Sequence, residues 1–131
     1  MGTLKLSDRS KRNLIDVHKD LQEVVCRAIQ ITEVDFMVTE GLRTKERQQE
    51  LFDAGASKTL NSRHLEQEDG TSHAIDICAL IGGRADWSFC IYEKLAVTFK
   101  QAAQDLGVDI QWGGDWPTFK DGCHFELKRG K

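Results

Sequence analysis

Residues 74–80 read Ala-Ile-Asp-Ile-Cys-Ala-Leu, an apolar run interrupted by the carboxylate of Asp76. A short apolar run that ends at a turn is typical of a buried central strand, and Gly82-Gly83 supplies the turn. A bare carboxylate inside such a strand costs several kcal/mol of desolvation free energy unless it is paired or bound to a metal. We therefore expect Asp76 to have a partner, either a metal ion or an arginine such as Arg43 or Arg63.

Helices are predicted on both sides of this strand from apolar residues that recur at intervals of three and four. They cover residues 17–31, 44–54 and 87–106. In the second helix Leu51 and Phe52 are expected to face the core. Gly55 and Gly107 follow the second and third helices, as glycines that end helices do.

Further strands are predicted from short segments bounded by turn residues. They cover residues 35–40, 108–112 and 123–127, while the polar residues 57–72 are expected to form a loop. The elements lack a regular strand–helix–strand alternation. This pattern favours an α+β fold: one small domain, residues 1–131, with a largely antiparallel sheet flanked by helices.

Composition limits the possible partners. The 131 residues carry a net charge of -3 with both signs interspersed, so no basic stripe is available for nucleic acid. No apolar segment approaches the ~20 residues that cross a bilayer, and the N-terminus lacks a secretion signal. We expect a soluble protein made in the cytoplasm. The four cysteines are scattered singly, and Cys26 and Cys78 are expected to be buried thiols that fill the core.

Two polar clusters have the composition of a catalytic zinc site, which needs three protein ligands and a nearby base. Ser62-Arg63-His64 is followed by His73 and Asp76, and Asp121 precedes His124 by three residues. Taken alone, a histidine at position 124 is more often a hydrogen-bonded core residue than a metal ligand. The conjunction of an acid and a histidine in two apolar strands favours a metal site.

These residues carry a family resemblance. The strings S-R-H, H-A-I-D, W-G-G-D-W and D-G-C-H-F-E, together with T-E-G-L-R-T from Thr39, resemble the zinc peptidases that cut peptidoglycan stem peptides. These are the D-alanyl-D-alanine carboxypeptidase family, with a hedgehog-type fold, and within it the phage endolysins that are L-alanyl-D-glutamate endopeptidases. The likeness runs over residues 34–127.

The resemblance implies roles for particular residues. His64, Asp76 and His124 would hold Zn²⁺, Asp121 would be the general base, and Arg43 would stabilise the oxyanion. Glu126 is a rival base. Ser62 and Arg63 would contact the ligands or the substrate, and Trp112, Trp116 and Phe119 would line a groove unless they pack in the core.

The spacing departs from the family pattern at one place. His64 and Asp76 are twelve residues apart, where the family has about seven, so about five residues look inserted. Another placement of the gap makes His73 the ligand. We favour His64 because it keeps the S-x-H string. The acidic insert with Glu66, Glu68 and Asp69 is expected to be a solvated loop, with a lid or a weak cation site as the alternative.

The subgroup likeness favours host-wall lysis by an endopeptidase. The alternatives are a D-Ala-D-Ala carboxypeptidase on the same fold and a zinc-bearing binding domain without activity. The resemblance to endolysins also implies a monomer without a separate wall-binding domain. It further implies that a holin-type protein is needed for the enzyme to reach the cell wall.

Overall fold

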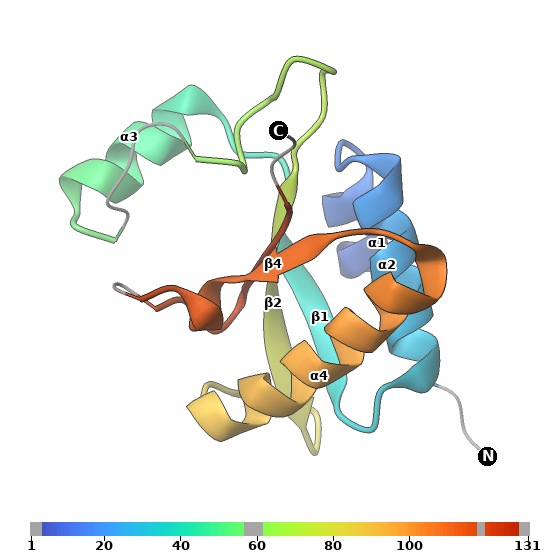
Figure 1. Cartoon of the computed structure of the whole chain (residues 1–131). Coiled ribbons are helices and arrows are strands. Elements are labelled where there is room, and N and C mark those ends of the chain that lie inside the picture. Colours follow the sequence, from blue (N-terminus) through green and yellow to red (C-terminus); the bar gives the residue numbers. More distant parts are fainter. Residues whose placement is uncertain (1–3, 57–61, 118–119, 129–131) are drawn as a thin grey trace.

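The computed structural model describes residues 4–56, 62–117 and 120–128, and it has an antiparallel sheet with helices α1, α2 and α4 on one side (Figure 1). The helices and strands are α1 Asp8–Leu14, α2 Lys19–Ile31, β1 Asp35–Glu40, α3 Lys45–Asp53, β2 Ala74–Ile81, β3 Arg84–Asp86, α4 Phe89–Leu106, β4 Ile110–Trp112, the 3-10 turn η1 Gly113–Asp115 and β5 His124–Leu127. The predicted α+β class with an antiparallel sheet is confirmed.

Strand β2 is the centre of the sheet, as its apolar sequence predicted. The strand order is β1-β2-β5-β4, and the short β3 also pairs with β2. Gly82 and Gly83 form the β2–β3 turn with φ of 59° and 80°, values that favour glycine. In the antiparallel β2–β5 pair, Asp76 lies opposite His124.

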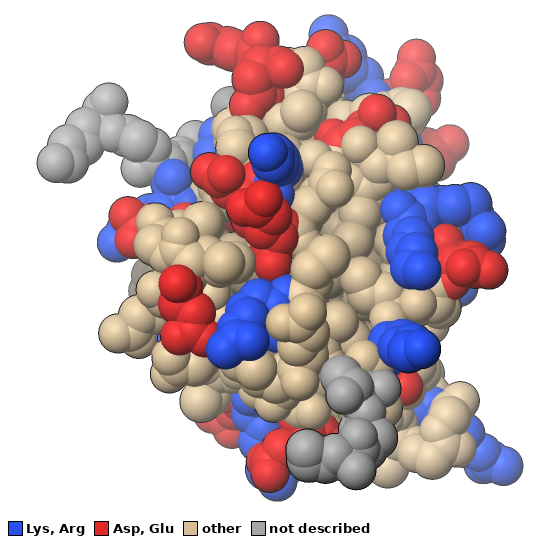
Figure 2. All heavy atoms as spheres, turned by 90° about the vertical axis from the view of Figure 1, so that its right-hand side faces the viewer, with Lys and Arg blue, Asp and Glu red and all other residues tan. Residues whose placement is uncertain are grey.

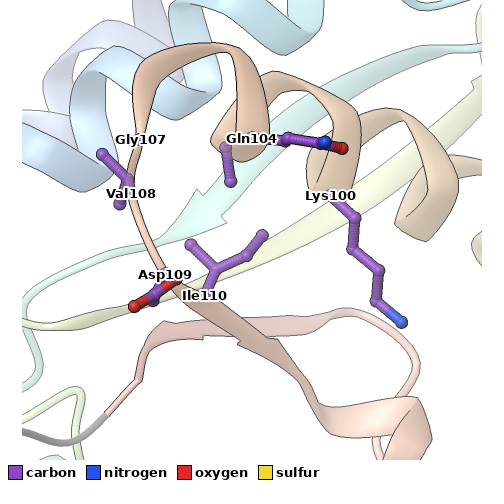
Figure 3. A pocket seen from close by; sticks show the side chains of 7 residues that line it. Lys100, Gln104, Gly107, Val108, Asp109 and Ile110 are labelled. Carbon is purple, nitrogen blue, oxygen red and sulfur yellow. The ribbon is translucent and has the colours of Figure 1, made fainter.

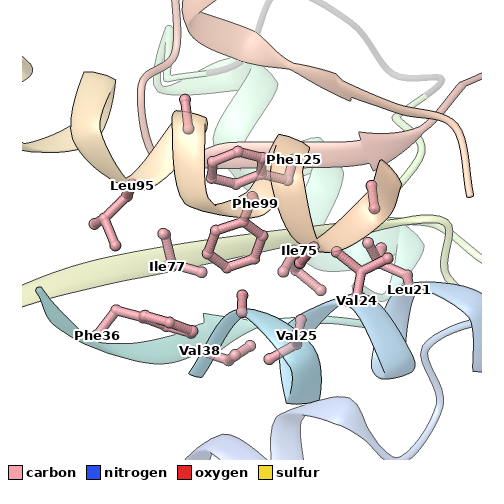
Figure 4. Packing of buried hydrophobic residues seen from close by; sticks show 14 of the residues in the cluster. Leu21, Val24, Val25, Phe36, Val38, Ile75, Ile77, Leu95, Phe99 and Phe125 are labelled. Carbon is pink, nitrogen blue, oxygen red and sulfur yellow. The ribbon is translucent and has the colours of Figure 1, made fainter. Parts of the chain in front are cut away.

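The two faces of β2 have different roles. Ile75 and Ile77 are fully buried and belong to the core cluster, which also includes Phe125 of β5. Phe99 of α4 stacks on Phe125 with ring centroids 4.4 Å apart, and side chains of α2 close the cluster (Figure 4). Because side chains alternate along a strand, Asp76 points to the opposite face. The core thus fixes the strand that presents the carboxylate.

The helix predictions were correct in place but not in every detail. Helix α2 begins at Lys19, two residues later than predicted, and a separate helix α1 that was not predicted precedes it. Helix α3 lies away from the other helices (Figure 1), and Phe52, which we expected in the core, is 40% exposed. Leu51 is only half-buried, whereas Gln48 is fully buried. The inward face of α3 therefore meets polar groups rather than the hydrophobic core.

The cysteine predictions had mixed outcomes. Cys78 is buried as expected, but Cys26 is exposed. The apolar stripe of α2 passes through Val24, Val25 and Ala28, and the next position after Val25 is rotated about 100° around the helix. The prediction for Cys26 was wrong because that rotation carries its side chain to the solvent side.

The surface carries both charge signs. On the face shown in Figure 2, Lys and Arg side chains lie beside Asp and Glu side chains without a continuous basic stripe. In the described part of the chain, no helix combines the length and the apolar character needed to cross a bilayer.

Candidate metal centre and active site

Three side chains from separate segments converge on the face of β2 opposite the core. They are His64, in the turn-rich segment before β2, Asp76 in β2, and His124 at the start of β5. Their potential ligand atoms all lie within 4.8 Å of one another. Oδ1 of Asp76 is 3.3 Å from Nε2 of His64 and 3.4 Å from Nδ1 of His124. The predicted ligand set is therefore gathered at one point.

Hydrogen bonds fix which nitrogen of each ring is free. Nδ1 of His64 lies 2.9 Å from the carbonyl oxygen of Gly41, and a carbonyl can only accept, so Nδ1 carries the proton. Nε2 of His124 lies 2.8 Å from Oε1 of Glu126, which likewise places a proton on Nε2. The other nitrogens, Nε2 of His64 and Nδ1 of His124, are the ones that face Asp76.

His64, Asp76 and His124, called the triad below, contain buried atoms that need a cation. Nε2 of His64 and Oδ1 of Asp76 are both buried and have no hydrogen-bond partner among the described residues. Two lone-pair atoms 3.3 Å apart repel each other unless a positive centre lies between them. Two imidazoles and one carboxylate are the donors that Zn²⁺ takes in catalytic sites. The residues therefore fit a zinc ion.

The charges of the three side chains depend on one another. Burial by itself would lower the pKa of the His124 ring, but the adjacent carboxylates of Asp76 and Glu126 raise it to about 9. Burial would also raise the pKa of Asp76, yet the imidazoles of His64 and His124 hold it well below its usual range. The pocket thus favours a carboxylate beside a positive charge.

His73 lies in a different environment. Its Nδ1 is 3.1 Å from the guanidinium of Arg63, which can only donate, so its proton is on Nε2. That Nε2 donates to Asp69 at 2.8 Å, and the ring of His18 packs against it edge-on with centroids 5.1 Å apart. His18 also has Nδ1 occupied, by the backbone N–H of Asp20. The geometry favours His64 over His73 as the ligand.

The same protonation pattern explains the cluster of His18, Asp69 and His73 without a metal. Both rings direct Nε2–H at Oδ2 of Asp69. The hydroxyl of Thr71 and the ring of His73 hold the pKa of Asp69 well below its usual range. The end of the insert is attached to the start of α2 by backbone hydrogen bonds from His18 to Ser72 and from Ser72 to Asp16, while Glu66 and Glu68 lie at the surface.

Arg43 is buried and has several partners. Its guanidinium donates to both carboxylate oxygens of Glu40 at 3.0 and 2.6 Å, to Gln48 at 2.7 Å, and to Oδ2 of Asp76 at 3.4 Å. Its backbone N–H also donates to the carbonyl of His64. Arg43 was expected either as a partner of Asp76 or, by the family resemblance, as a cation near the substrate. The contacts place Arg43 beside Asp76, with Glu40 neutralising part of its charge.

Asp121 lies next to the triad. One of its carboxylate oxygens is within 4.8 Å of a carboxylate oxygen of Asp76, and its Oδ1 accepts a bond from the thiol of Cys123 at 3.1 Å. Burial raises the pKa of this thiol, which therefore stays protonated. Gly113 makes the loop possible, because a Cβ there would come within 2.4 Å of the carbonyl oxygen of Asp121.

The remaining predicted residues fall into two groups. The Ser62 hydroxyl accepts the backbone N–H of His64 at 3.1 Å, and the ring of Trp116 lies 5.1 Å from that of His124, so both border the triad. Trp112 is only 6% exposed and donates its indole N–H to Gly122. It packs in the core, and Arg63 contacts His73 rather than a ligand. Phe119 lies outside the described residues.

The sequence did not predict which residues hold Arg43 and His64 in place. Glu40 and Gln48 hold Arg43, and the carbonyl of Gly41 fixes His64. Gly41 itself packs so closely on α1 that a Cβ would lie 2.0 Å from the carbonyl oxygen of Asn13. The string T-E-G-L-R was the available signal, since it places an acid, a glycine and an arginine together at the end of a strand.

A surface hollow lies elsewhere, at the end of α4. It measures about 340 Å³ and is lined by residues that include Lys100, Gln104 and Asp109 (Figure 3). None of its lining residues belongs to the triad, so it takes no part in the site.

Several known proteins are similar to this chain. A family model described as phage L-alanyl-D-glutamate peptidase matches residues 1–130. The L-alanyl-D-glutamate peptidase of Escherichia phage T5 is 30% identical over 98% of this chain and 92% of its own length. The crystal structure of the Serratia marcescens L-Ala D-Glu endopeptidase ChiX superposes with a TM-score of 0.85 at 42% identity, covering 95% of this chain and 90% of that one. A vancomycin-resistance D,D-dipeptidase, VanXYg, shares the fold with a TM-score of 0.50 at 17% identity, over 85% of this chain and 50% of that one.

Proposed function

The chain belongs to the phage L-alanyl-D-glutamate peptidase family, and on this premise we propose that it is a zinc endopeptidase that cleaves the L-alanyl-D-glutamate bond of peptidoglycan. His64, Asp76 and His124 would hold the zinc ion. The observation that carries the proposal is the pair of buried atoms, Nε2 of His64 and Oδ1 of Asp76, which lie 3.3 Å apart and have no hydrogen-bond partner in the described part of the chain.

When bound, zinc supplies a Lewis acid that acidifies a water molecule and polarises a carbonyl group. The protein's contribution is to hold the three ligands at one point before the ion arrives. Gly41 orients His64, Arg43 orients Asp76, and β2–β5 pairing sets Asp76 opposite His124. Little reorganisation free energy then opposes binding.

We propose Asp121 as the general base. Its carboxylate lies beside that of Asp76 on a loop held by Gly113, which suits a group that takes a proton from the attacking water. The same carboxylate then delivers the proton to the leaving amine, as peptide-bond hydrolysis requires. Oδ1 is engaged by the Cys123 thiol, which leaves Oδ2 for the proton.

Product analysis tests the proposal. Purified peptidoglycan is digested with the zinc-loaded protein, and the fragments are identified by mass spectrometry and amino-group labelling. New amino-terminal D-glutamate is expected, with loss of activity in a chelator and recovery on adding zinc. Release of free D-alanine would indicate a carboxypeptidase instead. Absence of any cleavage by the zinc-loaded protein would support a binding domain without activity.

We also propose that the enzyme acts as a monomer and reaches the wall after a holin-type protein has opened the membrane. The phage relatives support action on a host cell wall. Added from outside, the protein should lyse cells whose outer barrier has been permeabilised, and its mass in solution should equal that of one chain. A dimer at micromolar concentration would contradict the monomer.

A further inference from the structure

Glu126 is a buried carboxylate beside the metal triad. It follows His124 by two residues in β5, so both side chains lie on the same face of the sheet. Its side chain is 8% exposed, and Oε1 lies 2.8 Å from Nε2 of His124. Burying a carboxylate costs several kcal/mol unless a donor or a positive charge compensates it. The His124 ring supplies that donor.

The hydrogen bond lies on the edge of the ring that is remote from the ligand site. Nδ1 of His124 faces Asp76 at 3.4 Å, whereas Nε2 faces Glu126. The imidazole ring therefore separates the Glu126 carboxylate from the point where the three ligand atoms meet. A general base must reach the attacking water within hydrogen-bond distance, and Glu126 is on the wrong side of the ring for that task.

We propose that Glu126 is a positioning residue for the metal ion: its carboxylate fixes His124 as the Nε2–H tautomer and aims Nδ1 at the ion. The inference rests on the proposed zinc site. Carboxylates that accept from a ligand histidine orient the ring and raise its basicity, and their removal typically weakens metal affinity or activity about 10–100-fold. Glu126 also balances part of the positive charge that the ion brings into a buried place.

The experiment compares Glu126→Ala, Glu126→Gln and Glu126→Asp with the parent protein. The dissociation constant for zinc is measured by competition with a chromophoric chelator, and the visible spectrum of the cobalt-substituted protein reports ligand geometry. Glu93→Gln, which removes an exposed carboxylate on α4, is the matched control. Cleavage rates are measured at saturating zinc.

Glu126→Ala should weaken zinc binding about 10–100-fold and alter the cobalt spectrum. Glu126→Gln should stay closer to the parent, because its amide oxygen can still accept from Nε2–H. Glu126→Asp is too short to reach the ring and should resemble Glu126→Ala, which keeps the test valid if the alanine variant does not fold. Glu93→Gln should match the parent.

Two results would overturn the inference. Unchanged zinc affinity and cobalt spectrum in Glu126→Ala and Glu126→Asp would show that Glu126 does not position His124. Equal loss of cleavage rate in the Gln and Ala variants, with zinc affinity unchanged, would make Glu126 the base. Failure of the parent protein itself to bind zinc would instead refute the proposed function, and the two failures are thereby distinguished.

Discussion

Asp76 lies directly opposite His124 in the antiparallel pair of β2 and β5, with Oδ1 of the first 3.4 Å from Nδ1 of the second. Paired residues on neighbouring strands have their side chains on the same face and in contact. Two of the three proposed ligands are therefore placed by sheet register alone. The third, His64, comes from a loop and needs the Gly41 carbonyl to hold it.

The choice between His64 and His73 can be tested by metal content. His64→Ala should lose stoichiometric zinc, because it removes the free Nε2 that faces Asp76. His73→Ala should retain zinc, since its ring donates to Asp69 and accepts from Arg63. Elemental analysis after dialysis gives the answer. Zinc loss in the second variant and not in the first would reverse the ligand choice.

Asp121→Asn should separate catalysis from metal binding. The amide cannot take a proton, so the cleavage rate should fall about 10²–10⁴-fold, while zinc content stays at the parent level. Asp115→Asn is the matched control, because Asp115 is an exposed loop carboxylate paired with Lys100. Substantial cleavage by Asp121→Asn with zinc bound would assign the base elsewhere.

Without metal, the stability of the protein should depend on the state of His124. Its pKa is raised from 6.5 to about 9 in the folded protein, so folding favours the protonated ring. This stabilisation is complete below the unfolded pKa and is lost as pH rises through about 9, a change of a few kcal/mol at most. Urea unfolding in a chelator at about pH 6 and about pH 10 measures it.

His124→Gln serves as the control for this pH effect. Other groups also titrate at high pH, so the informative quantity is the difference in unfolding free energy between the parent and His124→Gln. That difference should shrink as pH rises. A constant difference over the whole range would show that the ring does not gain a proton on folding.

Replacing Arg43 should cost both stability and metal affinity. Arg43→Met leaves the carboxylates of Glu40 and Asp76 without their shared cation, and breaking a buried ion pair costs about 3–5 kcal/mol. Arg47→Met is the control, because Arg47 pairs with Glu50 at the surface, where such pairs contribute about 0–1 kcal/mol. Chemical denaturation and zinc titration provide the measurements.

A second outcome would support a direct catalytic role for Arg43. If Arg43→Lys kept the parent stability and zinc affinity but lost cleavage, the guanidinium would be acting on the substrate as the family resemblance implied. The contacts to Glu40, Gln48 and Asp76 lead us to expect losses in stability and zinc affinity as well.

The four thiols should differ in reactivity. Cys26 and Cys90 are exposed, Cys78 is buried and Cys123 is half-buried. Burial raises the pKa of the thiols of Cys78 and Cys123, and the nearby Asp76 and Asp121 raise that of Cys123 further. Since the thiolate is the reactive form, alkylation followed by mass spectrometry should label Cys26 and Cys90 first. In urea all four should react, and early labelling of Cys123 in the folded protein would contradict the structure.

Much of the fold followed from local patterns in the sequence. Residues 35–40 form β1, the apolar run around Asp76 forms β2, and Gly107 ends α4 with φ of 69°, because hydrophobic period and turn chemistry act over a few residues. Helix α1 was missed although Ser7 caps it. Its seven residues are too few to give a clear period. Asp76 and His124 stood out because an acid or a histidine inside an apolar run is costly without a partner, whereas His64 was chosen from the S-x-H string of the family resemblance.

The sequence by itself thus determined where β1, β2, β4 and β5 lie and which polar residues they carry, although it did not predict the short β3. Only the tertiary structure decided which atoms meet. His64 and His73 are both histidines near Asp76 in the sequence, but one ring donates Nδ1–H to a carbonyl and the other accepts from a guanidinium, and Arg43 is directed to Asp76 by Glu40 and Gln48. These partners come from distant segments of the chain. Whether a histidine nitrogen donates or accepts depends on which group the fold places beside it, and no local sequence pattern encodes that.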